Sequence, residues 1–233
     1  MRTTLGAIAV AWLAIGCSAT TSSSNIRTAG VVALIDVTSE REREAVVATE
    51  LVIGDSSSNT YMILEGGDRL TASVGSDVRV MTAVGSGEYE ARFAVSEGEV
   101  TVAFERDGDD DAPGSRGAIG PGFTIGGLSL EGPVSRATDS VSLSWSPVDP
   151  QAEVSVSLKG DCVISERKRL GGDTGSFTLS AGELRAWKRK ADQTCAVDVE
   201  IARTRSGTTD PALDADSRFS LHQVRRARFI STP

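Results

Sequence analysis

The stretch Ser140-Val141-Ser142-Leu143-Ser144-Trp145-Ser146-Pro147 carries the clearest fold signal in the chain. Val141, Leu143 and Trp145 alternate with serines, so an extended segment here has one apolar face and one polar face. This period of two is typical of a β-strand that covers a core on one side and meets solvent on the other. The proline that follows cannot donate a backbone hydrogen bond and marks the end of the strand.

Short alternating or apolar runs recur on both sides of this strand, separated by residues that favour turns. Glycine is abundant, at 24 residues, whereas stretches with helical periodicity are scarce. Short strands joined by turns at this spacing predict an all-β protein built from β-sandwiches. The expected strands lie near 31–35, 47–53, 61–64, 70–74, 78–80, 89–95 and 100–104, and, after Trp145, near 154–158, 177–179, 195–201 and 219–221.

Charge and length divide the chain into two small β-sandwich domains in tandem. We expect the first over residues 28–106, an acidic Gly- and Pro-containing linker over 107–122, and the second over 123–233. From residue 28 to 122, seven Arg and no Lys stand against 18 acidic residues, whereas from 123 onward 15 basic residues stand against 14 acidic ones. The net charge of −8 argues against a nucleic-acid partner, because phosphate binding needs a basic surface.

The strand pattern of residues 123–233 resembles the fibronectin type III or immunoglobulin-like sandwich. In this resemblance Trp145 lies on strand B and residues 196–203 form strand F. The chain departs from the pattern in the E–F connection, residues 181–194, which is longer than usual. Ser180 and Glu183 have the spacing of a capping box there, so we expect a short helix over 184–190.

The N-terminal stretch Leu13-Ala14-Ile15-Gly16-Cys17 resembles the lipobox of a bacterial lipoprotein, although Ala14 stands where that family most often has Leu. The apolar run before it has the length of a signal-peptide core and is too short to span a bilayer. The resemblance implies that residues 1–16 are removed as a signal peptide and that Cys17 is acylated. An ordinary secretory signal, in which Cys17 is incidental, is the alternative.

Residues 17–27 are rich in Ser and Thr and show no apolar periodicity, which predicts a flexible tether. The lipoprotein resemblance places the protein in the bacterial cell envelope, held in the lipid bilayer through Cys17. Ser18, directly after the modified cysteine, favours the outer membrane.

Lipidation of Cys17 would leave Cys162 and Cys195 as a pair in an oxidising compartment, where a disulfide is the default. On the sandwich scheme, Cys162 falls just past the end of strand C and Cys195 at the start of strand F. These strands are antiparallel neighbours, so the two cysteines are expected to lie close enough for a bridge.

Asp107, Asp109 and Asp111 repeat the start of an EF-hand calcium loop. The match then fails, because Ala112 stands where the turn needs Gly and Ala118 stands where a bidentate Glu should close the loop. We therefore expect a solvated acidic loop and no metal site, with a calcium-linked adhesion module as the alternative.

His222 is the only histidine, so any Ser–His or Cys–His mechanism must use it. The alternation of the last strand places it on the solvent-facing side with Arg226 and Arg228. No phosphate-binding loop, dinucleotide fingerprint or nucleophile elbow occurs in the sequence. We expect no enzymatic activity and no cofactor, a hydrolase of unrecognised type being the alternative.

Two basic clusters, Arg167-Lys168-Arg169 and Lys188-Arg189-Lys190, are expected in loops of the second domain, with Arg225, Arg226 and Arg228 on its last strand. They are either ordinary solvated charge or one face that binds an anionic polymer such as lipopolysaccharide or an acidic glycan.

The whole chain is also similar to a loose group of uncharacterised bacterial envelope lipoproteins that pair two small β modules. This similarity implies location but no chemistry. The sequence thus predicts a membrane-anchored, non-enzymatic structural or binding module, with an envelope protein or glycan as a possible partner class. The stretches that carry the similarity are residues 64–70 (LEGGDRL), 112–115 (APGS) and 209–213 (TDPAL).

Overall fold

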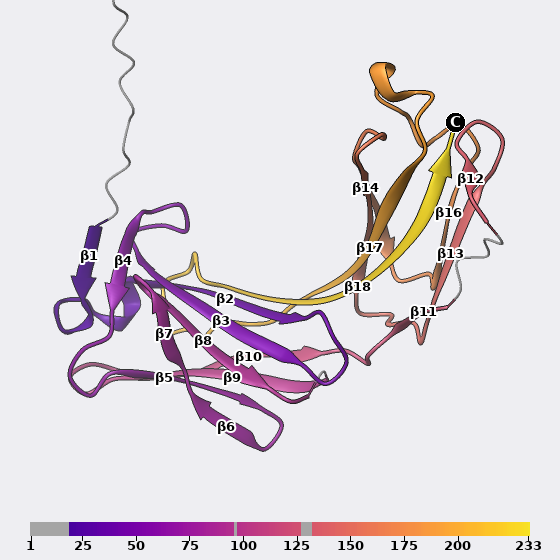
Figure 1. Ribbon diagram of the computed structural model, residues 1–233. Coiled ribbons are helices and arrows are strands. Elements are labelled where there is room, and N and C mark those ends of the chain that lie inside the picture. The colour runs from indigo at the N-terminus through magenta and orange to yellow at the C-terminus, as the bar shows by residue number, and fades with distance from the viewer. Residues whose placement is uncertain (1–18, 96, 127–131) are drawn as a thin grey trace, which may run out of the picture.

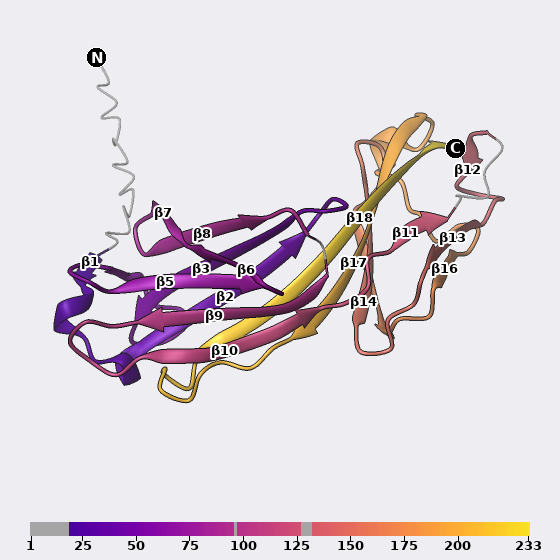
Figure 2. The same ribbon diagram turned by 90° about the horizontal axis from the view of Figure 1, so that it is seen from below.

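The computed structural model of the chain describes residues 19–95, 97–126 and 132–233. Apart from short 3-10 turns, the regular structure of these residues is β-strand. The strands pack into two sandwiches that lie one beyond the other, as Figure 1 and Figure 2 show from two directions. The predicted all-β sandwich fold is confirmed.

The first sandwich packs two sheets through their alternating inner faces. In β2, for example, Val31, Ala33, Ile35 and Val37 are buried, whereas Asp36 between them is exposed. Leu70, Val102 and Phe104 of the facing sheet complete the same core. One sheet contains β1 (Ala19–Ser22), β2 (Val31–Ser39), β3 (Ala45–Ile53), β4 (Thr60–Ile63), β7 (Thr82–Gly85) and β8 (Glu88–Phe93), and the other contains β5 (Arg69–Val74), β6 (Asp77–Val80), β9 (Gly98–Glu105) and β10 (Ala112–Ile119).

The second sandwich has the strand order expected from the resemblance. Trp145 lies on β13, in the position of strand B, and is only 2% exposed in the core. Three strands, β11 (Thr124–Gly126), β13 (Val141–Ser146) and β16 (Ser176–Leu179), face β14 (Glu153–Gly160), β15 (Glu166–Gly172), β17 (Cys195–Ser206) and the end of β18 (Arg218–Thr232), while β12 (Val134–Ser135) pairs with the last residues of β18.

Strand β18 belongs to both sandwiches. Its first part, from Arg218 to Gln223, pairs in parallel with β2 of the first sandwich. Phe219 and Leu221 are therefore buried in the first core, whereas Phe229 is buried in the second. The division predicted at residues 122 and 123 missed this return of the chain, because alternation shows which face of a strand is buried but not which sheet the strand joins.

The predicted linker, residues 107–122, contains strand β10, which pairs antiparallel with β9. The strand is hard to recognise because a bulge between Ala112 and Ser115 interrupts its alternation and its sequence is rich in small residues. Its outer edge meets the β17–β18 loop through the backbone of Arg116 and Thr208. The acidic loop before β10 and residues 120–122 after it remain outside the sheet.

The predicted flexible tether is also ordered from Ala19 onward. Residues 19–22 form β1, and two 3-10 turns, Ser23–Asn25 and Thr28–Gly30, lead into β2. No helix among the described residues is long and apolar enough to cross a membrane.

Candidate functional site

The segment that follows the predicted lipid-attachment residue is fastened to the first sandwich. Cys17 itself and the predicted signal peptide lie outside the described residues. Two residues later, Ala19 donates its backbone N–H to Asn59 O at 3.1 Å, and β1 runs parallel to β4 up to the pair Ser22–Ile63. The described chain therefore joins the sheet at its first residue.

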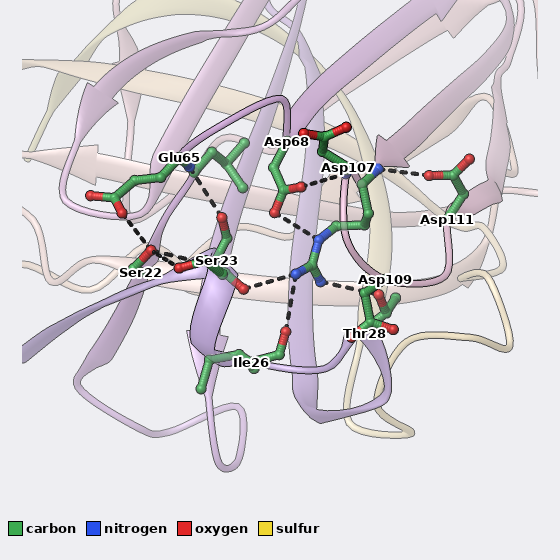
Figure 3. A network of polar contacts seen from close by, with 12 residues as sticks. Ser22, Ser23, Ile26, Thr28, Glu65, Asp68, Asp107, Asp109 and Asp111 are labelled. Carbon is green, nitrogen blue, oxygen red and sulfur yellow. Dashed lines mark hydrogen bonds and ion pairs between the residues drawn. The ribbon is translucent and has the colours of Figure 1, made fainter.

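Two serines extend this attachment beyond β1. The Ser22 hydroxyl donates to the carboxylate of Glu65, and the hydroxyl of the fully buried Ser23 accepts from Glu65 N at 3.1 Å. Figure 3 shows both serines beside the loop that carries Glu65 and Asp68. A Ser-rich sequence that looked like a tether thus supplies the hydrogen bonds that hold it down.

A buried arginine at the end of β9 completes the attachment. The Arg106 guanidinium donates to Asp68 Oδ2 at 2.8 Å, to Ser23 O at 2.8 Å, to Ile26 O at 3.0 Å and to Thr28 Oγ1 at 3.1 Å. The side chains of Arg106 and Asp68 are only 3% and 6% exposed. Breaking a buried ion pair is strongly destabilising, since removal of one partner leaves the other charged without compensation. We call Ser22–Thr28 with Arg106 and Asp68 the N-terminal clamp.

The electrostatics of the clamp favour the ionised state of Asp68. Burial opposes ionisation, but hydrogen bonds from Asp107 N and the Ser23 hydroxyl, together with the charge of Arg106, outweigh it and lower the pKa of Asp68. The backbone of Asp107 donates to Asp68 Oδ1 at 2.8 Å. The ion pair is therefore fully charged at neutral pH.

The acidic residues of the predicted linker serve this same region. Asp111 Oδ1 accepts from Arg106 N at 2.6 Å, and Asp109 Oδ1 accepts from Asp110 N at 2.7 Å (Figure 3). No group of three His, Cys, Asp or Glu side chains in the described part of the chain is placed to hold a metal ion. That the loop binds no calcium remains a prediction.

The connector between the sandwiches is held as firmly as the N-terminal segment. Arg203 forms an ion pair with Asp173 at 2.6 Å, with side-chain exposures of 1% and 0%, and donates to Pro121 O at 3.2 Å. Its guanidinium lies 4.1 Å from the centre of the Phe123 ring. Gln223 and Arg225 donate to Gly120 O and Phe123 O at 2.9 and 3.0 Å. We call this set the junction network.

An open groove of about 710 Å³ lies beside this junction, lined by Glu42, Arg43, Val95, Phe123 and Arg225 among others. Arg225 already donates to the backbone oxygens of Phe123 and Ser39. Acidic and basic groups alternate around the groove without a convergent set of polar atoms, which a specific small-molecule site requires.

The disulfide predicted between Cys162 and Cys195 is present, with a Cα–Cα distance of 5.9 Å. Cys162 lies two residues beyond β14, and Cys195 begins β17. These strands are antiparallel neighbours, with Gly160 opposite Val197, as the strand C and strand F assignment required.

The short helix predicted over 184–190 is wrong, and only a 3-10 turn at Lys188–Lys190 forms. Half of the capping box is present, because Ser180 N donates to Glu183 Oε2 at 2.7 Å. The chain then turns extended, since Ala186 pairs with Val163 and Ile164 N donates to Arg185 O at 2.8 Å. Pairing with the chain after Cys162 thus outcompetes the helix.

The basic residues do not form one common face. Arg226 pairs with Glu40 and Glu200, Arg228 pairs with Asp198, and Arg225 is half-buried in the junction network. Residues 167–169 lie on strand β15 and not in a loop. The antiparallel pairing of 163–164 with 185–186 puts them and residues 188–190 on opposite sides of this bridge, with Lys168 beside Glu183 and Lys190 beside Asp161 O.

His222 lies on the outer face of the first sandwich's sheet, as its alternation predicted. Its ring nitrogens lie 3.2 Å from Thr204 Oγ1 and 3.6 Å from Asp36 Oδ1. A hydroxyl, an imidazole and a carboxylate are the parts of a nucleophilic triad. Here they are cross-strand neighbours on an exposed sheet face, and the contact to Asp36 is too long for a hydrogen bond. The absence of enzymatic activity stays a prediction.

Comparison with known proteins adds only distant similarities in structure. No family model and no curated protein sequence matches the chain. The FN1–FN3 domains of chicken CNTN1 are 10% identical at a TM-score of 0.31, with 89% of this chain and 69% of that chain covered. A tetra-tandem repeat from the extending region of a large adhesion protein is 14% identical at a TM-score of 0.22, covering 85% and 49%.

A DUF3823 family protein from Bacteroides ovatus is 11% identical at a TM-score of 0.24, covering 81% of this chain and 98% of that one. Similarities at these identities and TM-scores say nothing about what the chain binds.

Proposed function

We propose that the protein is a lipid-anchored envelope protein that acts as a rigid, non-enzymatic structural or binding module. Residues 1–16 are its signal peptide, and Cys17 carries the lipid. The observation that carries this proposal is the attachment of residues 19–28 to the first sandwich, through β1 and the N-terminal clamp, which begins two positions after Cys17. A secretory protein with an incidental cysteine has no need to secure this short polar segment with a buried ion pair.

The clamp has a mechanical consequence for the anchored protein. Ala19 is two positions after Cys17, and two residue steps span at most about 7 Å. Acyl chains on Cys17 would therefore hold the first sandwich against the bilayer surface instead of on a long tether. Several acyl chains anchor firmly where one alone is marginal.

The junction network then determines how the second sandwich is presented. Strand β18 passes through both sandwiches, and the side chains of Arg203, Gln223 and Arg225 hold the connector between them. The second sandwich therefore stands at a fixed angle to the first, at the end away from β1 (Figure 1, Figure 2). A rigid element of this kind suits a spacer or a binding module, and no described group of side chains argues for catalysis.

Replacing Cys17 with Ser tests the anchor. We expect the unaltered protein to take up radiolabelled palmitate and to stay in the membrane fraction after a high-salt wash. The Cys17→Ser variant should lose the label and appear in the soluble fraction. Ser18→Ala is the matched control, because it changes the neighbouring residue but keeps the thiol. Membrane association of Cys17→Ser that survives the salt wash would refute the proposal.

A further inference from the structure

The E–F connection of the second sandwich contains an exposed tryptophan, which three basic residues follow directly in the sequence. Trp187 is 51% exposed, whereas Trp145, the other tryptophan of the described residues, is 2% exposed. The 3-10 turn Lys188–Lys190 follows directly, so three cations come next to Trp187 in the chain. We call residues 185–193 the tip loop. It protrudes from the end of the second sandwich that faces away from the first (Figure 1).

The cations of the tip loop are available to a partner. Lys188 and Arg189 are exposed, and neither has an ion-pair partner among the described residues. Within the loop Asp192 is the acidic residue, and Glu183 lies two residues before the loop, against the four basic residues Arg185, Lys188, Arg189 and Lys190, so a positive surplus remains.

The tip loop is rigid although it is exposed. Trp187 N donates to Cys162 O at 3.2 Å, next to the disulfide, and Lys190 N donates to Trp187 O at 2.8 Å. The buried Arg136 also donates to two backbone oxygens of the loop, Ala191 O at 3.0 Å and Gln193 O at 2.9 Å. A loop that is already ordered loses little conformational entropy on binding, so its exposed groups can contribute fully to affinity.

We propose that the tip loop docks onto an anionic phospholipid surface, with the Trp187 indole among the headgroups and the basic residues against lipid phosphates. Tryptophan prefers the membrane–water interface, because its ring is apolar and its N–H is polar. Lys and Arg near an anionic bilayer add a further attraction that depends on salt. This proposal stands whether or not Cys17 carries lipid.

The shape of the tip loop favours a bilayer over a glycan. Sugar and small-molecule sites are recesses in which several polar groups converge on one ligand. The tip loop instead projects one aromatic ring and a row of point charges from a turn. Such a surface matches a plane of phosphates, and it cannot enclose a sugar ring.

The test uses the chain from residue 17 onward carrying Cys17→Ser, so that neither an acyl chain nor the apolar run of residues 5–15, which contains Trp12, contributes to binding or fluorescence. Sedimentation with vesicles of equal parts phosphatidylglycerol and phosphatidylcholine is compared with sedimentation with phosphatidylcholine alone. We expect binding to the anionic vesicles only, falling as salt rises through the range in which the Debye length becomes shorter than about 10 Å. A Cys17→Ser protein bound only through the tip loop should be released by high salt, which separates this proposal from the lipid anchor.

The predicted loss of vesicle binding in two double variants tests which basic residues contact the bilayer. Lys188→Gln with Arg189→Gln should weaken partition by about 20-fold, since each cation contributes about fivefold near an anionic surface. Arg41→Gln with Arg218→Gln removes the same charge from exposed positions on the first sandwich and should change partition less than about twofold.

Fluorescence supplies a readout for the indole itself. Because Trp145 is buried, a blue shift of the emission and protection from iodide on adding anionic vesicles would report Trp187. Trp187→Phe should abolish the shift while the protein still sediments with the vesicles. Equal binding to neutral vesicles, no effect of the tip variants, or binding to dextran sulfate without binding to anionic vesicles would each overturn the proposal.

Discussion

The N-terminal clamp and the junction network solve the same problem in different ways. Each holds a stretch of chain that is poor in apolar side chains, and each uses a buried arginine paired with an aspartate. Arg106 directs its donors to the backbone of residues 23–28 and to Asp68, with every guanidinium nitrogen satisfied. Arg203 lies over the Phe123 ring and leaves its Nε without a partner.

The two regions differ in how much of the structure depends on their arginine. In the clamp, one arginine and two serines hold a segment that can peel away from an otherwise intact sandwich. The junction network is embedded in strands that both cores share, so Arg203 cannot be lost without disturbing the whole molecule. Charged hydrogen bonds can therefore fix backbone segments that lack apolar residues. How far the loss of the arginine spreads depends on whether its strands are shared by both cores.

Arg203→Met should be the most destructive change. It would leave the fully buried carboxylate of Asp173 uncompensated, which costs about 4 kcal/mol in free energy of unfolding. Chemical denaturation would measure the loss. Arg228→Met is the matched control, because its pair with Asp198 is exposed, and it should cost less than about 1 kcal/mol. Equal losses in the two variants would contradict the assigned role.

Arg106→Met should cost less, about 3 kcal/mol, and its effect should be local. Hydrogen exchange at the amides of Ile26 and Gly30, which close the two 3-10 turns, should become much faster. Exchange in β17 should change little if the segment peels away by itself. Loss of protection throughout the second sandwich would show that the clamp and the junction are coupled.

The sequence predicted the strands well wherever one face is apolar. All seven expected strands of the first sandwich form, and Trp145, Cys162 and Cys195 lie where the fibronectin-like pattern placed them. Alternation is a local property of the chain, so it can be read from local sequence.

Tertiary pairing limited the prediction elsewhere. Residues 19–28 and 112–119 looked like a tether and a linker because their hold on the fold comes from distant partners, Arg106 for the first and β9 for the second. The helix expected over 184–190 lost to pairing with Val163. The clamp had one signal in the sequence, since Asp68 lies in the LEGGDRL stretch, but nothing there indicated Arg106 as its partner.

The pH dependence of the clamp gives the smallest and most specific prediction. The pKa of Asp68 is lower in the folded protein than its ordinary value of 3.8, so its ionisation stabilises the fold above that pH. This contribution is lost as the pH falls below 3.8 and the folded carboxyl takes up a proton.

Asp68→Asn should therefore lower the free energy of unfolding by about 1.5–3 kcal/mol at neutral pH, the range for hydrogen bonds to a charged group. The difference from the unaltered protein should narrow as the pH falls below 3.8, because the protonated carboxyl of Asp68 and the amide that replaces it are both neutral. Denaturation at a series of pH values would measure it, with Asp161→Asn as an exposed control expected to change stability by less than about 0.5 kcal/mol. If the difference in free energy of unfolding between Asp68→Asn and the unaltered protein stayed constant down to acid pH, Asp68 would stabilise the clamp through packing instead of charge. The contrast between the clamp and the junction network would then depend on Arg106 alone.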